Sequence, residues 1–96
     1  MAVGLRAKFA GGTQAQYDAL HARLDTENTP PEGIIFHSAG PIEEGWGVID
    51  FWESRAHFDW FVEQRLQPAL HELGDQALPG PQEIKEFPVY NIVKSY

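Results

Sequence analysis

Two residues in the middle of the chain have the chemistry of a general base and of the carboxylate that would orient it. His37 lies in the segment Gly-Ile-Ile-Phe-His-Ser-Ala, and Asp50 lies in Trp-Gly-Val-Ile-Asp-Phe-Trp. If residues 40–45 form a turn of even length, His37 faces Val48, and Asp50 lies diagonally from His37 on the same face of a sheet. A neighbouring carboxylate favours the protonated imidazole and fixes one tautomer. We therefore predict that His37 and Asp50 form a catalytic proton-transfer pair.

A purely structural role for Asp50 is the alternative to this pair. Its carboxylate could cap backbone groups or bind Arg6 on a neighbouring strand, since structural ion pairs are also common around buried carboxylates. A turn of odd length, or a bulge, would place His37 and Asp50 on opposite faces of the sheet. The pair therefore depends on the parity of one turn.

Aromatic and histidine side chains are predicted to line a pocket for an apolar or aromatic small molecule. Tyr17 and His21 share one face of a predicted helix, and a Phe-x-x-Phe pattern marks a second helix. The predicted substrate-binding residues are Tyr17, His21, Trp52, Phe58, Phe61 and Tyr90. The same side chains could instead fill the core, because large aromatic residues are mostly buried. An interior without a cavity would then indicate a structural or regulatory protein.

The elements that position these residues follow from the spacing of the apolar side chains. Alternation predicts strands, and a helical period predicts helices. The predicted strands cover residues 2–9, 33–39, 46–52 and 83–95, and the predicted helices cover 14–26 and the long apolar run after Ser54. Pro68 lies inside that run, so we expect a kink there, or a break with a short helix restarting at Pro68. Pro88 confines the last strand to an edge or a bulge.

The order strand, helix, strand, strand, helix, strand predicts an α+β fold of ferredoxin-like βαββαβ type. One domain would span residues 1–96, with a four-stranded antiparallel sheet and both helices on one of its faces. The third strand is apolar on both faces, so its second face needs a cover. A second copy of the chain is the simplest cover, and we therefore predict a homodimer.

Composition excludes several other kinds of protein. The chain has 96 residues, no cysteine and a formal net charge of -7. Disulfides and thiolate chemistry are therefore impossible, and the acidic balance argues against nucleic acid and against anionic membranes as partners. Neither a signal peptide nor a spanning segment can be recognised, which makes the cytoplasm the expected location.

One stretch carries a resemblance to a known family. Residues 45–55 read Gly-Trp-Gly-Val-Ile-Asp-Phe-Trp-Glu-Ser-Arg and run into Phe58 and Phe61. A strand that ends in Trp-Glu-Ser-Arg and leads to Phe-x-x-Phe resembles the dimeric α/β-barrel proteins of the antibiotic-biosynthesis-monooxygenase type. The resemblance covers the whole chain by topology and is specific over residues 45–62. It implies a dimer closed into an α/β barrel, and a cofactor-independent monooxygenase, cyclase or isomerase that acts on an aromatic or polyketide-like molecule.

The resemblance also raises haem as a ligand. Haem-degrading members of the superfamily pair a helical Trp with a His about three turns later, and they carry an Asn on the first strand. Here Phe61 stands at the Trp position beside Trp60, His71 lies further along, and residues 2–9 contain no Asn. Haem degradation is therefore not expected. A non-catalytic dimer that binds haem or another apolar ligand remains the alternative to an enzyme.

The motifs of other chemistries are missing from the sequence. Gly11 and Gly12 do not extend into a phosphate-binding loop, no histidine spacing indicates a metal, and no Gly-x-Ser-x-Gly elbow occurs. We therefore expect neither a cofactor nor a metal ion.

Overall fold

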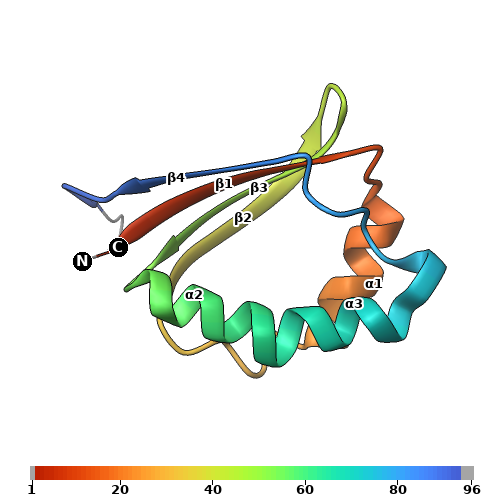
Figure 1. Cartoon of the computed structure of the whole chain (residues 1–96), viewed down its shortest axis with the longest axis horizontal. Coiled ribbons are helices and arrows are strands. Elements are labelled where there is room, and N and C mark those ends of the chain that lie inside the picture. Colours follow the sequence, from red (N-terminus) through yellow and green to blue (C-terminus); the bar gives the residue numbers. More distant parts are fainter. Residues whose placement is uncertain (1, 94–96) are drawn as a thin grey trace.

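The computed structural model describes residues 2–93, which form one sheet with a layer of helices on one of its faces (Figure 1). The strands are β1 Val3–Ala10, β2 Ile34–Ile42, β3 Gly45–Trp52 and β4 Glu83–Pro88. The helical elements are α1 Gln14–Leu24, α2 Arg55–Phe61, the π turn η1 Val62–Leu66, α3 Gln67–Leu73 and the 3-10 turn η2 Gly74–Gln76. The predicted α+β, ferredoxin-like order is confirmed.

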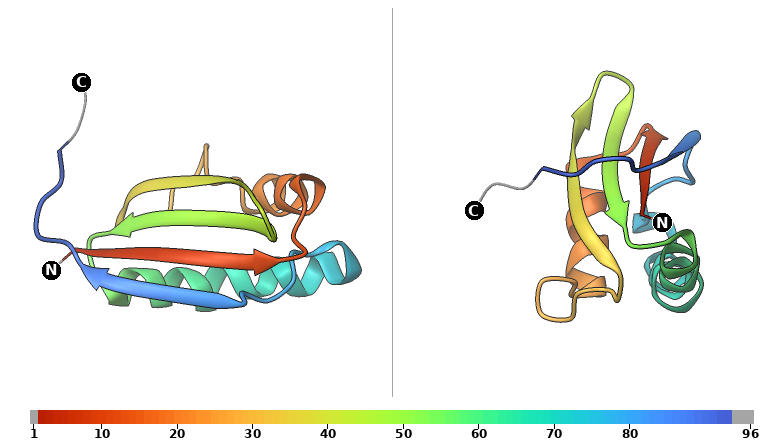
Figure 2. Two further views of the ribbon diagram at one scale, coloured as in Figure 1. Left: turned by 90° about the horizontal axis from the view of Figure 1, so that it is seen from above. Right: turned by 90° about the vertical axis from the view of Figure 1, so that its left-hand side faces the viewer.

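The sheet is antiparallel, with the strand order β2-β3-β1-β4. Alternation sends one set of side chains toward the helices, where Val3, Leu5, Trp46 and Trp52 are buried. Figure 2 shows the helices on this side of the sheet and open space on the other. The core is therefore one layer between sheet and helices, as the alternation of the first strand predicts.

The first helix begins at a reciprocal cap. The Thr13 hydroxyl accepts the backbone N–H of Gln16, and the Gln16 side chain accepts the backbone N–H of Thr13. The helix ends at Asp25, whose backbone is left-handed. These two ends fix which face of α1 lies against the sheet, and that face carries Tyr17, Leu20 and His21.

The α-helix is interrupted before Pro68 and starts again as the short helix α3, which is one of the two predicted alternatives, but the predicted kink does not occur. Figure 1 shows α2 and α3 continuing as one rod, and the wider turn η1 lies between them. Pro68 follows that turn in the first turn of α3. A proline lacks the N–H that an α-helical turn would use, and its ring crowds the preceding turn. A local i→i+5 turn accommodates the proline without a change of direction.

Two predicted boundaries were wrong. The strand β2 extends through Pro41 to Ile42, so the turn contains only Glu43 and Glu44. The last strand ends at Pro88 instead of residue 95. Residues 89–93 have no regular structure, and residues 94 and 95 of the predicted strand lie outside the described part of the chain. Within the described residues, no helix has both the length and the apolar character needed to span a membrane.

Candidate active site

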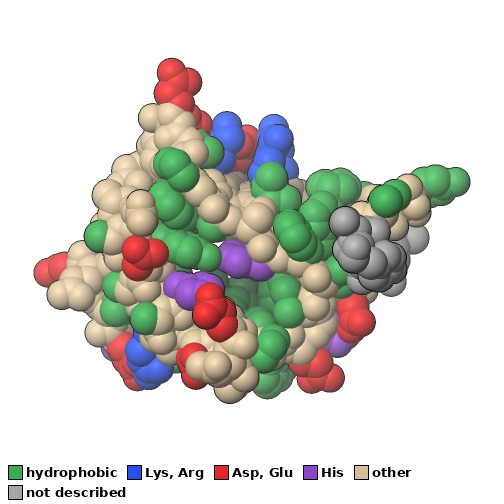
Figure 3. All heavy atoms as spheres, turned by 180° about the vertical axis from the view of Figure 1, so that it is seen from behind, with side chains coloured by type: hydrophobic (Ala, Val, Ile, Leu, Met, Phe, Trp, Pro, Cys, Tyr) green, Lys and Arg blue, Asp and Glu red, His purple; other side chains and the backbone are tan. Residues whose placement is uncertain are grey.

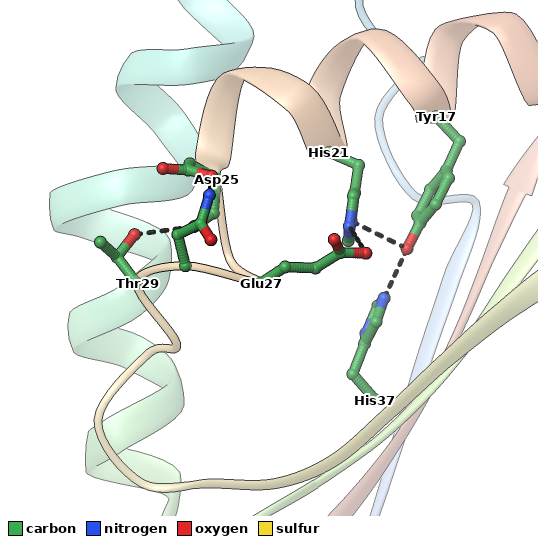
Figure 4. A network of polar contacts seen from close by, with 7 residues as sticks. Tyr17, His21, Asp25, Glu27, Thr29 and His37 are labelled. Atoms are coloured by element: carbon green, nitrogen blue, oxygen red, sulfur yellow. Dashed lines mark hydrogen bonds and ion pairs between the residues drawn. The ribbon is translucent and has the colours of Figure 1, made fainter.

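Tyr17, His37 and Asp50 form a connected chain of hydrogen bonds on the helix-facing side of the sheet. His37 Nδ1 lies 2.5 Å from Asp50 Oδ1, and His37 Nε2 lies 2.6 Å from the Tyr17 hydroxyl oxygen. Both ring nitrogens of His37 are therefore engaged, one from a strand and one from α1. Figure 4 shows Tyr17 reaching from the helix toward His37 on β2.

The register of the hairpin explains why His37 and Asp50 meet. The turn has even length, as predicted, and the two residues share a face. They are directly opposed instead of diagonal, because the turn is shorter than residues 40–45 and Val48 pairs with Ala39. Arg6 pairs with Ile49 and therefore points to the opposite face, so it is not the partner of Asp50.

The surroundings of Asp50 keep its carboxylate oriented. Its side chain is 14% exposed, and Trp52 Nε1–H donates to its second oxygen at 3.4 Å. A carboxylate accepts hydrogen bonds, so it selects the tautomer of His37 with the proton on Nδ1. The other nitrogen, Nε2, then accepts the hydrogen bond of the Tyr17 hydroxyl. In this tautomer His37 is arranged to act as a base through Nε2.

Tyr17 is held as a neutral phenol. Burial raises the pKa of its hydroxyl above the ordinary value of 10.0, and the carboxylates of Asp50, Asp18 and Glu27 raise it further. The Tyr17 ring lies 5.3 Å from that of Trp46, centroid to centroid, which fixes the hydroxyl against β2. Tyr17 is therefore a hydrogen-bond donor at neutral pH.

The chain of contacts continues past Tyr17 toward solvent. The Tyr17 hydroxyl lies 3.5 Å from His21 Nδ1, and His21 Nε2 lies 3.3 Å from Glu27 Oε1 (Figure 4). The sequence pattern placed Tyr17 and His21 on one helical face but did not identify Glu27. No periodic signal marks Glu27, because it lies in the irregular loop after α1.

Of the remaining predicted binding residues, only Trp52 touches the hydrogen-bonded chain in the described part of the structure, through its contact with Asp50. Trp52 is fully buried, and its rings lie 5.7 Å from Phe58 and 5.4 Å from Phe61, centroid to centroid. These three aromatic side chains pack against one another as core. Tyr90 follows the end of β4 and is completely exposed, so the structure does not bring it to the hydrogen-bonded chain.

A surface view shows that part of this region is open. Figure 3 looks at the back of the molecule, where histidine side chains lie in a hollow bordered by hydrophobic side chains, with an acidic side chain beside them. The side chain of His37 is 37% exposed and that of His21 is 32% exposed. A small molecule can therefore approach the imidazoles without an opening of the core.

His71 lies on the last turn of α3, is exposed, and stands apart from the hydrogen-bonded chain. Across residues 2–93, no group of three or more His, Cys, Asp or Glu side chains is placed to hold a metal ion. The described residues thus offer polar side chains for proton transfer and no arranged metal site.

Solved structures share this fold. No protein-family model and no curated protein matches the chain. A protein of Chloroflexus aurantiacus J-10-fl, described as an antibiotic biosynthesis monooxygenase, is 20% identical with a TM-score of 0.67, over 97% of this chain and 98% of that one. SnoaB, a cofactor-independent oxygenase from Streptomyces nogalater, is 16% identical with a TM-score of 0.64, over 98% and 97%.

A third structure extends the comparison to a protein that holds a porphyrin. A variant of MhuD, with two manganese protoporphyrin IX molecules per active site, is 20% identical with a TM-score of 0.56, over 99% of this chain and 100% of that one. The predicted resemblance is therefore confirmed at the level of the fold. The chain has the fold of antibiotic-biosynthesis-monooxygenase-like proteins, and activity has to be argued from the site.

Proposed function

We propose that the chain is a cofactor-independent enzyme that removes a proton from an aromatic or polyketide-like small molecule. The observation that carries this proposal is the hydrogen-bonded chain from Tyr17 through His37 to Asp50. A carboxylate, an imidazole and a neutral phenol in line supply a base, its orienting group and a hydrogen-bond donor. The fold shared with SnoaB, a cofactor-independent oxygenase, supports the same class of reaction.

The proposed proton transfer follows from the hydrogen-bond partners of Tyr17, His37 and Asp50. A substrate hydroxyl or acidic C–H that displaces the Tyr17 hydroxyl from His37 Nε2 gives its proton to that nitrogen. The carboxylate of Asp50 stabilises the imidazolium that forms, and the Tyr17 hydroxyl donates to the new oxyanion. The substrate anion then reacts with dioxygen, closes a ring onto its own carbonyl, or is reprotonated at another atom.

Anthrone is a suitable probe, because loss of one proton from its methylene gives an aromatic anion. With dioxygen as oxidant, one anthrone and one O2 give one anthraquinone and one water. The measurements are oxygen uptake and anthraquinone absorbance, against buffer alone. We expect the rate to fall by about 100-fold or more in His37→Ala, since general-base catalysis contributes that much. Circular dichroism would show that the variant folds, and full activity in it would remove His37 from the mechanism.

The proposed assembly is a homodimer formed through the outer face of the sheet. Phe36, Phe51 and Phe87 form a row across this face, with ring centroids 6.3 and 6.2 Å apart. The row is continuous because Gly4 leaves room for the Phe87 ring. The helices cover only the other face, so these aromatic rings are solvent-exposed or half-exposed in the single chain. An apolar row of this kind is typical of an interface between subunits.

A non-catalytic dimer that binds an apolar ligand or haem is the second candidate. The packing of Trp52, Phe58 and Phe61 against one another does not favour it, because side chains that fill the interior leave no ligand space there and indicate a structural or regulatory protein instead. Haem titration separates this candidate from the first. A Soret shift that is lost in His71→Ala, together with unchanged oxygen uptake in His37→Ala, would favour the binding protein.

A further inference from the structure

Five polar side chains form a continuous chain of contacts from the sheet to the loop after α1. Glu27, His21, Tyr17, His37 and Asp50, here called the Tyr17 network, are joined end to end by the contacts described above. Glu27, at the outer end, has a side chain that is 84% exposed, whereas Asp50, at the inner end, is 14% exposed. The network therefore runs from a partly buried carboxylate to a carboxylate in water.

The number of protons that this network needs follows from its donors and acceptors. Asp50 and Glu27 only accept, so His37 Nδ1 and His21 Nε2 must each carry a proton. The single hydroxyl proton of Tyr17 can go to only one histidine. The other histidine must donate to the Tyr17 oxygen, which requires a proton on its second nitrogen as well. All four contacts are satisfied only when the two histidines together carry one extra proton.

Two arrangements of the protons meet this condition. They interconvert by one proton transfer through the Tyr17 hydroxyl. In the first, His37 is neutral and accepts from Tyr17, while His21 is an imidazolium. In the second, His37 is the imidazolium and Tyr17 donates to a neutral His21. Asp50 favours the second arrangement and Glu27 favours the first. The Tyr17 hydroxyl lies 2.6 Å from His37 Nε2 and 3.5 Å from His21 Nδ1. The longer contact, with His21, must therefore shorten before the proton can move between the two histidines.

The charges around the Tyr17 network are otherwise few. From α1, Asp18 acts on the Tyr17 hydroxyl, together with Asp50 from β3 and Glu27 from the loop. The nearby guanidinium of Arg65, on η1, donates to the carbonyl oxygens of Leu24 and Thr29 at 2.8 and 2.9 Å. It thereby holds the loop that carries Glu27 and leaves the carboxylates free to attract the shared proton.

We propose that the Tyr17 network shares one mobile proton, and that His21 and Glu27 exchange the proton of His37 with solvent whenever the Tyr17 hydroxyl contacts His37, so that a proton taken from a substrate can leave and the proton needed to form water can return. His21 and Glu27 are then positioning and proton-transfer residues that do not touch the reacting atoms. The sharing of the proton is a property of the protein alone. The second half rests on the proposed function, because it needs His37 to act as the base.

Nitrogen-15 NMR of the histidine rings against pH tests the shared proton without any substrate. We expect His21 and His37 to take up the first proton together, each ring showing partial protonation over one range of pH, and to take up the second in a separate step. In Tyr17→Phe, each ring should titrate alone in a single step. His57 and His71 lie outside the network and serve as internal controls in both proteins. Independent single steps for His21 and His37 in the unmodified protein would overturn the proposal.

Turnover of anthrone tests whether His21 and Glu27, here called the outlet, exchange the proton of His37 with solvent. We expect His21→Ala to lower kcat about tenfold with little change in KM, and imidazole in the buffer to restore it, because a small base can replace the missing carrier. Glu27→Gln should lower kcat, whereas Glu32→Gln, in the same loop, should not. Imidazole that restores neither variant would overturn the outlet. If the unmodified protein does not turn over anthrone, the proposed function fails on that substrate, while the NMR titration still decides whether the proton is shared.

Discussion

At the scale of single residues, Tyr17 determines how the site can work. Among residues 2–93, its hydroxyl is the only group that contacts both His21 and His37, and its ring is held by Trp46 on the sheet. Burial and three carboxylates favour its neutral form. In the proposed mechanism, the same residue donates to the oxyanion and occupies His37 Nε2 until a ligand replaces it.

The ionisation of Tyr17 gives a prediction about pH. Because burial raises the pKa of Tyr17 above 10.0, the folded chain holds the phenolic proton more tightly than the unfolded chain does. The associated stability is complete below pH 10.0 and is lost as pH rises through the higher folded pKa. In the unmodified protein, the ultraviolet tyrosinate signal should include a step above pH 10 that comes from Tyr17. We expect this step to be missing in Tyr17→Phe. Its Tm should also fall less steeply above pH 10. Identical titration curves would contradict this account of Tyr17.

The parts of the candidate site that the sequence could predict are those that depend on the regular spacing of side chains in strands and helices. His37 and Asp50 share a face because strand side chains alternate, so the parity of one turn was sufficient. Tyr17 and His21 share a face because they are four residues apart on a helix. Glu27 could not be predicted, because its position depends on the irregular path of residues 25–33. Nor could the sequence show that Tyr17 reaches His37, which depends on how α1 packs against β2.

At the scale of elements, the hairpin between β2 and β3 sets the register of the site. The tight turn of this hairpin brings the backbone of Gly45 against the backbone at the end of β1 and just after it. A Cβ atom at Gly45 would lie 2.2 Å from the carbonyl oxygen of Phe9 and 2.7 Å from the backbone nitrogen of Gly11. The φ angle of Gly45 is +155°, which also favours glycine. The register that pairs His37 with Asp50 thus depends on a residue without a side chain.

We predict that Gly45→Ala lowers the free energy of unfolding by about 2 kcal/mol, because backbone atoms cannot move aside as a side chain could. Urea unfolding followed by circular dichroism measures the loss. Gly80→Ala is the matched control, since a Cβ atom there meets nothing within 4 Å. Equal stability of the two variants would show that the hairpin can relax around the added methyl group.

The elements also show where a sequence rule was insufficient. The rule that proline ends or bends a helix treats the helix as a uniform α-helix. The chain accommodates Pro68 by a local change of period at η1. That change also places Arg65 where its guanidinium reaches the end of α1 and the following loop. Such a connection between distant segments exists only in the folded molecule, so periodicity along the sequence cannot reveal it.

At the scale of the whole molecule, the sheet has one covered face and one open face. The open face carries the row of Phe36, Phe51 and Phe87, and beside it the cations Arg6 and Lys85. The chain as a whole has a net charge of -7, so this face is less negative than the average surface. Two copies that meet through it bury apolar rings and keep most of the acidic surface in water. The two-sided apolar character of the third strand predicts a second copy of the chain as the cover of this face.

The dimer is tested by its mass in solution. We expect light scattering to give about twice the chain mass of 10.8 kDa for the unmodified protein, and a value near 10.8 kDa for the double variant Phe36→Ser, Phe87→Ser. Removing two aromatic rings from the centre of an interface lowers the binding free energy by more than most interfaces tolerate. Trp60→Ser is the control, because Trp60 is 53% exposed, comparable to the 56% of Phe36, but lies on α2, on the opposite side of the sheet. A dimer that survives the double variant but is lost in Trp60→Ser would place the interface on the helices. An unmodified protein that remains a monomer would mean that the aromatic row has another partner.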